Sequence, residues 1–237
     1  MSGGKGGAKG SGGRGGLHVR VKTAKRRSVS STRWLQRQLN DPYVRRAQAE
    51  GYRSRAAYKL IELDEKFGFL KKSRAVVDLG ITPGGWSQVV RKANPRARRR
   101  DRPAPLRADR RGRNPRDGFH GRCRPDALIE ALGSAPDLVI SDMAANTVGH
   151  PQTDHLRTIG LAETAADFAV QNLLPGGVFV AKVFAGGADR ELLTLLKRHF
   201  STVKHAKPPA SRKGSPELYV IAQGFKGRSD ATETETD

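Results

Sequence analysis

Short strand-like runs alternate along the chain with longer stretches in which apolar residues recur at helical spacing. The short runs predict strands over residues 75–79, 136–142, 177–184, 202–205 and 217–223. The longer stretches predict helices over residues 42–66, with a break near Gly51, and over 86–92, 154–173 and 189–199. This alternation of strands and helices predicts an α/β domain.

One predicted strand, residues 177–184, is almost continuously apolar but contains Lys182. Such a run is expected where helices cover both faces of a sheet. A lysine buried there must be paired or have a depressed pKa, and either condition suits a general base. Asp142 ends the preceding strand, so both side chains are expected at the carboxyl edge of a parallel sheet, where ligands bind. An edge lysine and a helix-capping aspartate are the ordinary alternatives.

The sequence DLGITPGGW, residues 78–86, predicts a strand, a glycine-rich turn and the start of a helix. Glycines let a ligand approach the backbone, and the free N–H groups of a helix N-terminus attract a carboxylate or a phosphate. The order G-x-x-P-G-G differs from the dinucleotide fingerprint G-x-G-x-x-G, which disfavours a nicotinamide-dependent enzyme. A tight turn without a ligand remains the alternative.

The 237 residues include 44 Lys and Arg against 23 Asp and Glu, a formal charge of +21. Two segments carry this excess: residues 1–40 hold ten basic and no acidic side chains, and residues 91–124 hold fourteen basic and three acidic ones. The composition predicts a disordered basic arm over residues 1–30, a domain over 31–225 and a disordered acidic tail over 226–237. The arm is either an RNA contact or a solubilising tail.

The sequence contains no apolar stretch near the roughly 20 residues that a membrane-spanning helix needs. It has no hydrophobic signal-peptide core at its start, and its single cysteine, Cys123, cannot form an internal disulfide. We therefore expect a cytoplasmic protein without a membrane partner. We also expect a monomer and no metal site.

Five motifs in order along the chain resemble the FtsJ/RrmJ (RlmE) family of ribosomal RNA large-subunit methyltransferases. They are SSTRWLQRQLNDPYVRRAQAEGYRSRAAYKL, VVDLGITPGGWSQ, DLVISDMAANTVGH, LLPGGVFVAKVF and SPELYVIA. The resemblance implies a Rossmann-like sheet, mostly parallel with one antiparallel strand, and the cofactor S-adenosylmethionine. It implies methylation of a uridine 2′-hydroxyl in 23S rRNA of the large ribosomal subunit. It also places Gly84, Trp86 and Asp142 in the cofactor site.

The family's catalytic set of two lysines, an aspartate and a glutamate falls on Lys59, Asp142, Lys182 and Glu217. Without the resemblance, Lys59 and Glu217 would be read as ordinary surface charges. A ribose hydroxyl is a poor nucleophile, so we assign its activation, or the stabilisation of its alkoxide, to Lys182. Lys59 and Asp142 would orient the hydroxyl and tune the lysine. Glu217 would position Lys182 or the substrate.

The arginine-rich block, residues 98–124, departs from the family pattern, which has two further strands there with acids for the adenosine end of the cofactor. Asp101 and Asp117 lie near the expected places, but their surroundings do not match. The block is either a basic insertion that binds rRNA or the product of two compensating frameshifts. We favour frameshifts, because the family pattern stops and resumes abruptly. Strands 2 and 3 would then be disrupted, with the first strand exposed and cofactor binding weakened.

Two other functions remain open at this point. The same four catalytic residues would serve a 2′-O-methyltransferase for another RNA, such as a tRNA or an mRNA cap. The chain could also be a catalytically impaired RNA-binding protein. Affinity for S-adenosylmethionine distinguishes the enzyme from the RNA-binding protein.

Overall fold

A computed structural model describes residues 28–80, 83–94, 129–130, 132–145, 148–186 and 189–227. The arginine-rich block and the predicted disruption of strands 2 and 3 lie outside these residues, as do most of the predicted arm and tail. The chain divides into two compact units, Met1–Arg46 and Ala47–Asp237. Within the described ranges, no helix combines the length and the apolar character needed to cross a bilayer.

The described part of the first unit contains helix α1 (Val29–Leu39) and the beginning of α2 (Pro42–Ala49). The sequence pattern did not predict α1. Ser28 caps this helix, because its side chain accepts a hydrogen bond from the backbone N–H of Ser31 at 3.2 Å. The domain boundary that we expected at residue 30 therefore falls inside a helix.

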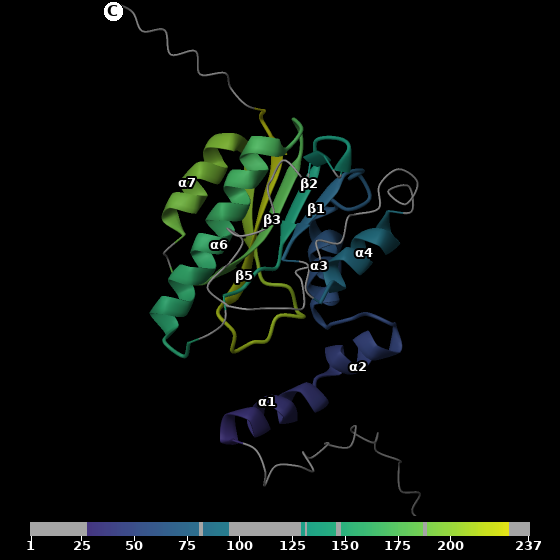
Figure 1. Cartoon of the computed structure of the whole chain (residues 1–237), viewed down its shortest axis with the longest axis vertical. Coiled ribbons are helices and arrows are strands. Elements are labelled where there is room, and N and C mark those ends of the chain that lie inside the picture. The colour runs from purple at the N-terminus through teal and green to yellow at the C-terminus, as the bar shows by residue number, and fades with distance from the viewer. Residues whose placement is uncertain are drawn as a thin grey trace, which may run out of the picture. The chain divides into compact units, whose positions relative to one another are not determined.

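The described part of the second unit contains a five-stranded sheet with helices on both faces (Figure 1). The strand order across the sheet is β1 (Val76–Leu79), β2 (Leu138–Ser141), β3 (Val178–Phe184), β5 (Glu217–Phe225) and β4 (Phe200–Ala206). Neighbours β1, β2 and β3 run parallel, whereas β5 is antiparallel to β3 and to β4. This confirms a Rossmann-like sheet, mostly parallel with one reversed strand.

Helices lie on both faces of this sheet (Figure 1). One face packs against α3 (Ala56–Phe67) and α4 (Gly85–Ala93), and the other packs against α6 (Pro151–Asn172) and α7 (Arg190–His199). Successive side chains of a strand point to opposite faces, so both faces need apolar residues. This is why the central strands read as continuous apolar runs. The predicted break near Gly51 is confirmed, since α2 ends before α3 begins.

Alternation along the strands also decides which polar side chains share a face. Val180 of β3 and Ile221 of β5 belong to the core under α3 and α4. Lys182 is two residues after Val180, and Tyr219 and Glu217 are two and four residues before Ile221, so all three face the same helices. In the strand register, Lys182 pairs with Tyr219. The carboxyl end of β3 and the start of β5 therefore bring their polar residues to one place.

Candidate active site

The structure brings the four predicted catalytic residues together at the carboxyl edge of the sheet. Lys59 comes from α3, Lys182 from β3 and Glu217 from the start of β5, while Asp142 directly follows β2. The two lysines are each only 8 % exposed. A buried charge is costly unless it is paired, and each of these four side chains has an oppositely charged partner.

The four charges alternate in sign along a chain of short contacts. Lys59 Nζ lies 2.8 Å from Glu217 Oε2, and Lys182 Nζ lies 2.8 Å from Asp142 Oδ1. A distance of 3.9 Å from Lys182 Nζ to Glu217 Oε2 links the two pairs. Lys182 Nζ also donates to the backbone carbonyl of Asp142 at 3.0 Å. Lys182 Nζ thus lies close to three oxygen atoms near the carboxyl end of its strand.

The pKa of Glu217 is the net result of opposing effects. Burial raises the pKa of its carboxyl, but the positive charges of Lys59 and Lys182 lower it, as do hydrogen bonds from Lys59 and Ser211. The lowering effects win, so the pKa of Glu217 lies below its usual range. Glu217 is therefore ionised at neutral pH and can hold both lysines.

Tyr219 also belongs to this cluster, although the sequence analysis did not single it out. Its hydroxyl donates to Asp142 Oδ1 at 2.8 Å, and its ring lies 5.7 Å from the ring of Trp86 between centroids. Burial and the nearby carboxylates of Asp142 and Glu217 raise the pKa of its phenol, so it remains a donor at neutral pH. The period of two along β5 was the signal that could have identified it, because Tyr219 shares the face of Glu217.

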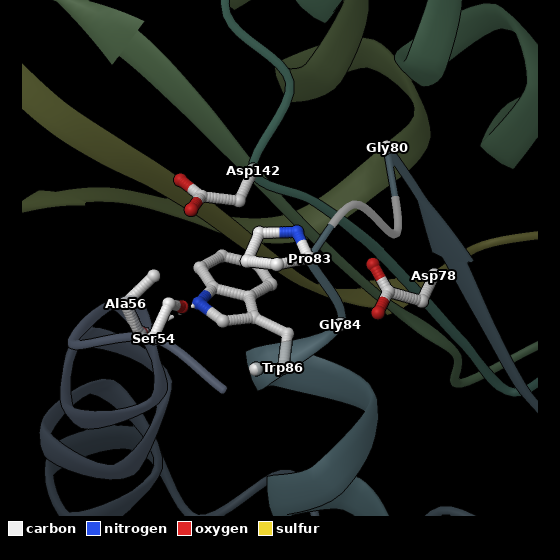
Figure 2. A pocket seen from close by; sticks show the side chains of 9 residues that line it. Ser54, Ala56, Asp78, Gly80, Pro83, Gly84, Trp86 and Asp142 are labelled. Atoms are coloured by element: carbon white, nitrogen blue, oxygen red, sulfur yellow. Dashed lines mark hydrogen bonds between the residues drawn. The ribbon is translucent and has the colours of Figure 1, made fainter. Parts of the chain in front are cut away.

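A pocket lies beside the cluster, between the glycine-rich turn and the end of β2 (Figure 2). The three predicted cofactor residues, Gly84, Trp86 and Asp142, all line it. The other lining residues are Ser54, Ala56, Asp78, Gly80, Pro83 and Gly85. Asp142 thus belongs to the pocket and to the ion-pair chain. A group bound in the pocket would contact Asp142, which forms the ion pair with Lys182.

Two of the glycines that line the pocket lie too close to neighbouring side chains to carry a Cβ. Gly80 and Gly84 both have positive φ, 86° and 92°, which residues with a Cβ rarely adopt. A Cβ at Gly80 would overlap the side chain of Met143, and one at Gly85 would lie 2.7 Å from Ser54 Oγ. The indole of Trp86 is fixed by its N–H, which donates to the carbonyl of Ala56 at 2.9 Å. The pocket wall is therefore closely packed.

Two polar side chains that the sequence analysis did not predict as site residues lie in the pocket. Asp78 accepts a hydrogen bond from the hydroxyl of Ser87 at 2.5 Å, and burial raises its pKa to about 6 despite that bond, with a further rise from Asp142. The hydroxyl oxygen of Ser54 is buried and has no hydrogen-bond partner among the described residues. Figure 2 shows Asp78 and Asp142 on opposite sides of Pro83 and Trp86. Asp78 could have been suspected, because it lies one residue before the carboxyl end of β1.

Two further points of the sequence analysis concern a metal site and the acids of the arginine-rich block. Among the residues that the structure describes, no group of three or more His, Cys, Asp or Glu side chains is placed to hold a metal ion. The acidic residues Asp101 and Asp117 belong to the block outside the described ranges.

The matching family model and the similar proteins are all described as methyltransferases. Residues 52–225 match the model of the family described as FtsJ-like methyltransferase. The chain is 82 % identical to a Sphingopyxis alaskensis protein named ribosomal RNA large subunit methyltransferase E, over 97 % of this chain and 98 % of that protein. A protein of the same name from Novosphingobium aromaticivorans is 66 % identical, over 90 % of this chain and 96 % of its own length.

A solved structure shares the fold. It is assigned to a ribosomal RNA methyltransferase from Plasmodium falciparum and is 30 % identical in sequence, with a TM-score of 0.56. The superposition covers 75 % of this chain and 100 % of the other.

Proposed function

The chain belongs to the family of FtsJ-like methyltransferases, and on this premise we propose that it methylates a uridine 2′-hydroxyl in 23S rRNA of the large ribosomal subunit, with S-adenosylmethionine as the methyl donor. Relatives that align over nearly their whole length are named for the large-subunit ribosomal RNA. The observation that carries the proposal is the ion-pair chain of Lys59, Glu217, Lys182 and Asp142, adjoining a pocket that shares Asp142.

The pocket fits S-adenosylmethionine by its chemistry. This cofactor carries an ammonium and a sulfonium, and the pocket offers the carboxylates of Asp78 and Asp142. It also carries a carboxylate, which suits the start of α4, where the N-cap residue Gly84 has no side chain to bond the first backbone N–H groups. The buried hydroxyl of Ser54 lacks a partner among the described residues, so it can bond to a polar group of the ligand. Bound there, the cofactor supplies an electrophilic methyl group.

The side chains around the pocket can prepare the ribose hydroxyl for attack. Lys182 accepts its proton as a neutral amine, or stabilises the developing alkoxide as an ammonium, through Nζ. Asp142 and Glu217 hold that Nζ in place, at 2.8 and 3.9 Å. Lys59 supplies a second positive charge on the other side of Glu217, where it can orient the hydroxyl. The buried setting strengthens these interactions, since fewer waters screen them.

The proposal also covers the substrate particle, the oligomeric state, the cellular compartment and the mode of RNA binding. We propose that the substrate is rRNA within the large ribosomal subunit, that the enzyme acts as a monomer, and that it works in the cytoplasm. Phosphate contacts would dominate RNA affinity, so binding should weaken steeply as salt concentration rises. The ten basic residues of the first forty are the segment of the chain best suited to such contacts.

Methyl transfer from labelled S-adenosylmethionine to unmodified large ribosomal subunits tests the proposal, with tRNA and capped mRNA as competing substrates. We expect label in the 23S rRNA, resistant to alkali at one uridine, because 2′-O-methylation blocks cleavage there. Lys182→Ala should lower the rate at saturating cofactor by at least about a hundredfold, the usual contribution of a positioned acid or base. Label in tRNA or cap alone, or full activity of Lys182→Ala, would contradict the proposal.

A further inference from the structure

A buried serine contacts the catalytic glutamate from the connection between β4 and β5, residues 207–216. Ser211 Oγ donates to Glu217 Oε1 at 2.6 Å, and Ser211 is only 4 % exposed. The other carboxylate oxygen, Oε2, accepts from Lys59 and lies near Lys182. The two oxygens of Glu217 therefore have separate partners, the hydroxyl on one side and the lysines on the other.

The backbone beside Ser211 is held on both sides by charged side chains. The carbonyl of Ala210 accepts from Arg55 Nη2 at 2.6 Å, and the N–H of Ala210 donates to Glu62 Oε2 at 2.6 Å. Within the connection, Lys207 Nζ donates to the carbonyl of Ser215 at 2.6 Å. Hydrogen bonds to charged groups are stronger than neutral ones, so these contacts restrict the position of the connection.

Helix α3 contributes to both sides of Glu217. Lys59 and Glu62 are three residues apart on this helix, so they project from the same face. Lys59 bonds Glu217 Oε2 directly. Glu62 accepts a hydrogen bond from the N–H of Ala210, the residue before Ser211, and Ser211 in turn bonds Glu217 Oε1. One helical turn therefore sets the position of both partners of the carboxylate.

We infer that Ser211 is a positioning residue for methyl transfer, which orients the Glu217 carboxylate so that Oε2 faces Lys59 and Lys182. The inference rests on the proposed function. The terminal torsion of a glutamate has a broad profile, so partial rotation of the carboxylate about it costs little unless a second contact opposes it. A hydroxyl bonded to Oε1 restrains that rotation. It thereby keeps Oε2 close to Lys182, so that the Lys59–Glu217 pair stays linked to the Lys182–Asp142 pair.

The main test is Ser211→Ala, assayed for kcat, cofactor affinity and the pH dependence of kcat. Loss of a hydrogen bond to a charged group should lower kcat by about tenfold. Cofactor affinity should be unchanged, since Ser211 does not line the pocket. The acid limb of the pH profile should move to higher pH, because Glu217 loses a bond that favours its charged form. Lys59, Lys182 and Tyr219, which face Glu217 from α3, β3 and β5, stay in place.

A matched control removes a serine hydroxyl at the other end of the same pair of strands. Ser201 Oγ donates to the carbonyl of Gly224 at 3.1 Å, far along β4 from the site. Ser201→Ala should keep the wild-type kcat and pH profile. A second pair of variants tests the link to α3. Glu62→Gln retains an acceptor for the N–H of Ala210, so its kcat and pH profile should stay near those of the wild type. Glu62→Ala should reproduce the shifted acid limb of Ser211→Ala.

The outcomes separate this inference from the proposed function. If Ser211→Ala keeps the wild-type kcat and pH profile while Lys182→Ala is inactive, the inference fails and the proposed function stands. A uniform loss of activity without a shifted acid limb would make Ser211 merely structural, which also overturns the inference. Full activity of Lys182→Ala would instead overturn the proposed catalytic set.

Discussion

Tyr219 donates its hydroxyl hydrogen to the same oxygen of Asp142, Oδ1, that forms the ion pair with Lys182, and both distances are 2.8 Å. The ring of Tyr219 also packs against Trp86 in the pocket wall. One residue of β5 therefore packs against the pocket wall and bonds the carboxylate that pairs with Lys182. Loss of its hydroxyl alone should affect the chemistry of the site more than the fold.

The first prediction follows from that contact. Tyr219→Phe keeps the ring and its packing but removes the donor to Asp142. We expect kcat to fall by about tenfold, the cost of one hydrogen bond to a charged group, with a small change in melting temperature. Steady-state methyl transfer and thermal unfolding measure the two effects. The matched control is Tyr52→Phe, whose ring packs against Tyr58 outside the pocket; an equal loss in both variants would contradict the prediction.

A second prediction concerns the buried pair of Lys59 and Glu217. Removing one partner leaves the other charge buried without its closest oppositely charged partner, so Lys59→Met and Glu217→Gln should each destabilise the fold by about 3 kcal/mol. The double variant should be less destabilised than the sum of the singles, because neither charge of the pair remains. Urea unfolding of all four proteins gives this coupling energy. Additive effects would show that the two side chains do not act as a pair.

A third prediction uses the titration of Asp78. The pKa of this carboxyl is about 6 in the folded protein, against an ordinary value of 3.8. A group whose folded pKa is raised stabilises the fold below its unfolded pKa and loses that contribution as pH rises through the folded pKa. Asp78→Asn cannot ionise, so its unfolding free energy should exceed that of the wild type by up to about 3 kcal/mol at pH 8. Near pH 4 the two should differ little.

Chemical denaturation of the cofactor-free protein at several pH values between 4 and 8 measures this difference. Ser87→Ala provides a matched comparison, since its hydroxyl lowers the pKa of Asp78. Its loss should move the pH-dependent change to higher pH. A constant difference between Asp78→Asn and the wild type across this range would show that Asp78 does not titrate there.

A fourth prediction concerns Ser54. Its hydroxyl is buried without a partner among the described residues, so Ser54→Ala should leave the stability of the free protein unchanged or raise it slightly. If the hydroxyl bonds the cofactor, the same change should weaken S-adenosylmethionine binding by about tenfold. Calorimetric titration gives the affinity. Unchanged affinity would place the hydroxyl outside the binding site.

A fifth prediction concerns the arginine-rich block. If compensating frameshifts produced it, another reading frame of the coding DNA over residues 98–124 should encode a strand ending in an acid and a following D-F turn. Replacing the block with a segment of that kind should then raise cofactor affinity and methyl transfer. A basic insertion that binds rRNA predicts the opposite, a loss of activity on ribosomal particles. If neither alternative reading frame encodes such a segment, the frameshift explanation is excluded.

Much of the fold could be predicted because each strand and helix has its own periodicity. The central strands were recognisable as apolar runs, and the break between α2 and α3 as a glycine in a helical stretch. Helix α1 was not predicted, because it follows a glycine-rich basic segment and offers no apolar run. Its start depends on one capping contact at Ser28, which a search for hydrophobic periods does not detect.

The site was predicted unevenly, for a similar reason. Asp142 and Lys182 stood out locally, as an acid that ends a strand and a charge within an apolar run. Lys59 and Glu217 did not, and only the resemblance to a family marked them. They are 158 residues apart in sequence, and their 2.8 Å contact forms only when α3 packs over the start of β5.

The sequence by itself determined the order of strands and helices, the glycine turn and the family motifs, because these depend on residues close together along the chain. The tertiary structure decided which charges meet. It placed Tyr219, Ser211 and Asp78 around the pocket and the ion pairs, since their roles depend on contacts between distant segments and on burial. Pairing, hydrogen-bond sharing and raised or lowered pKa values are properties of that packing.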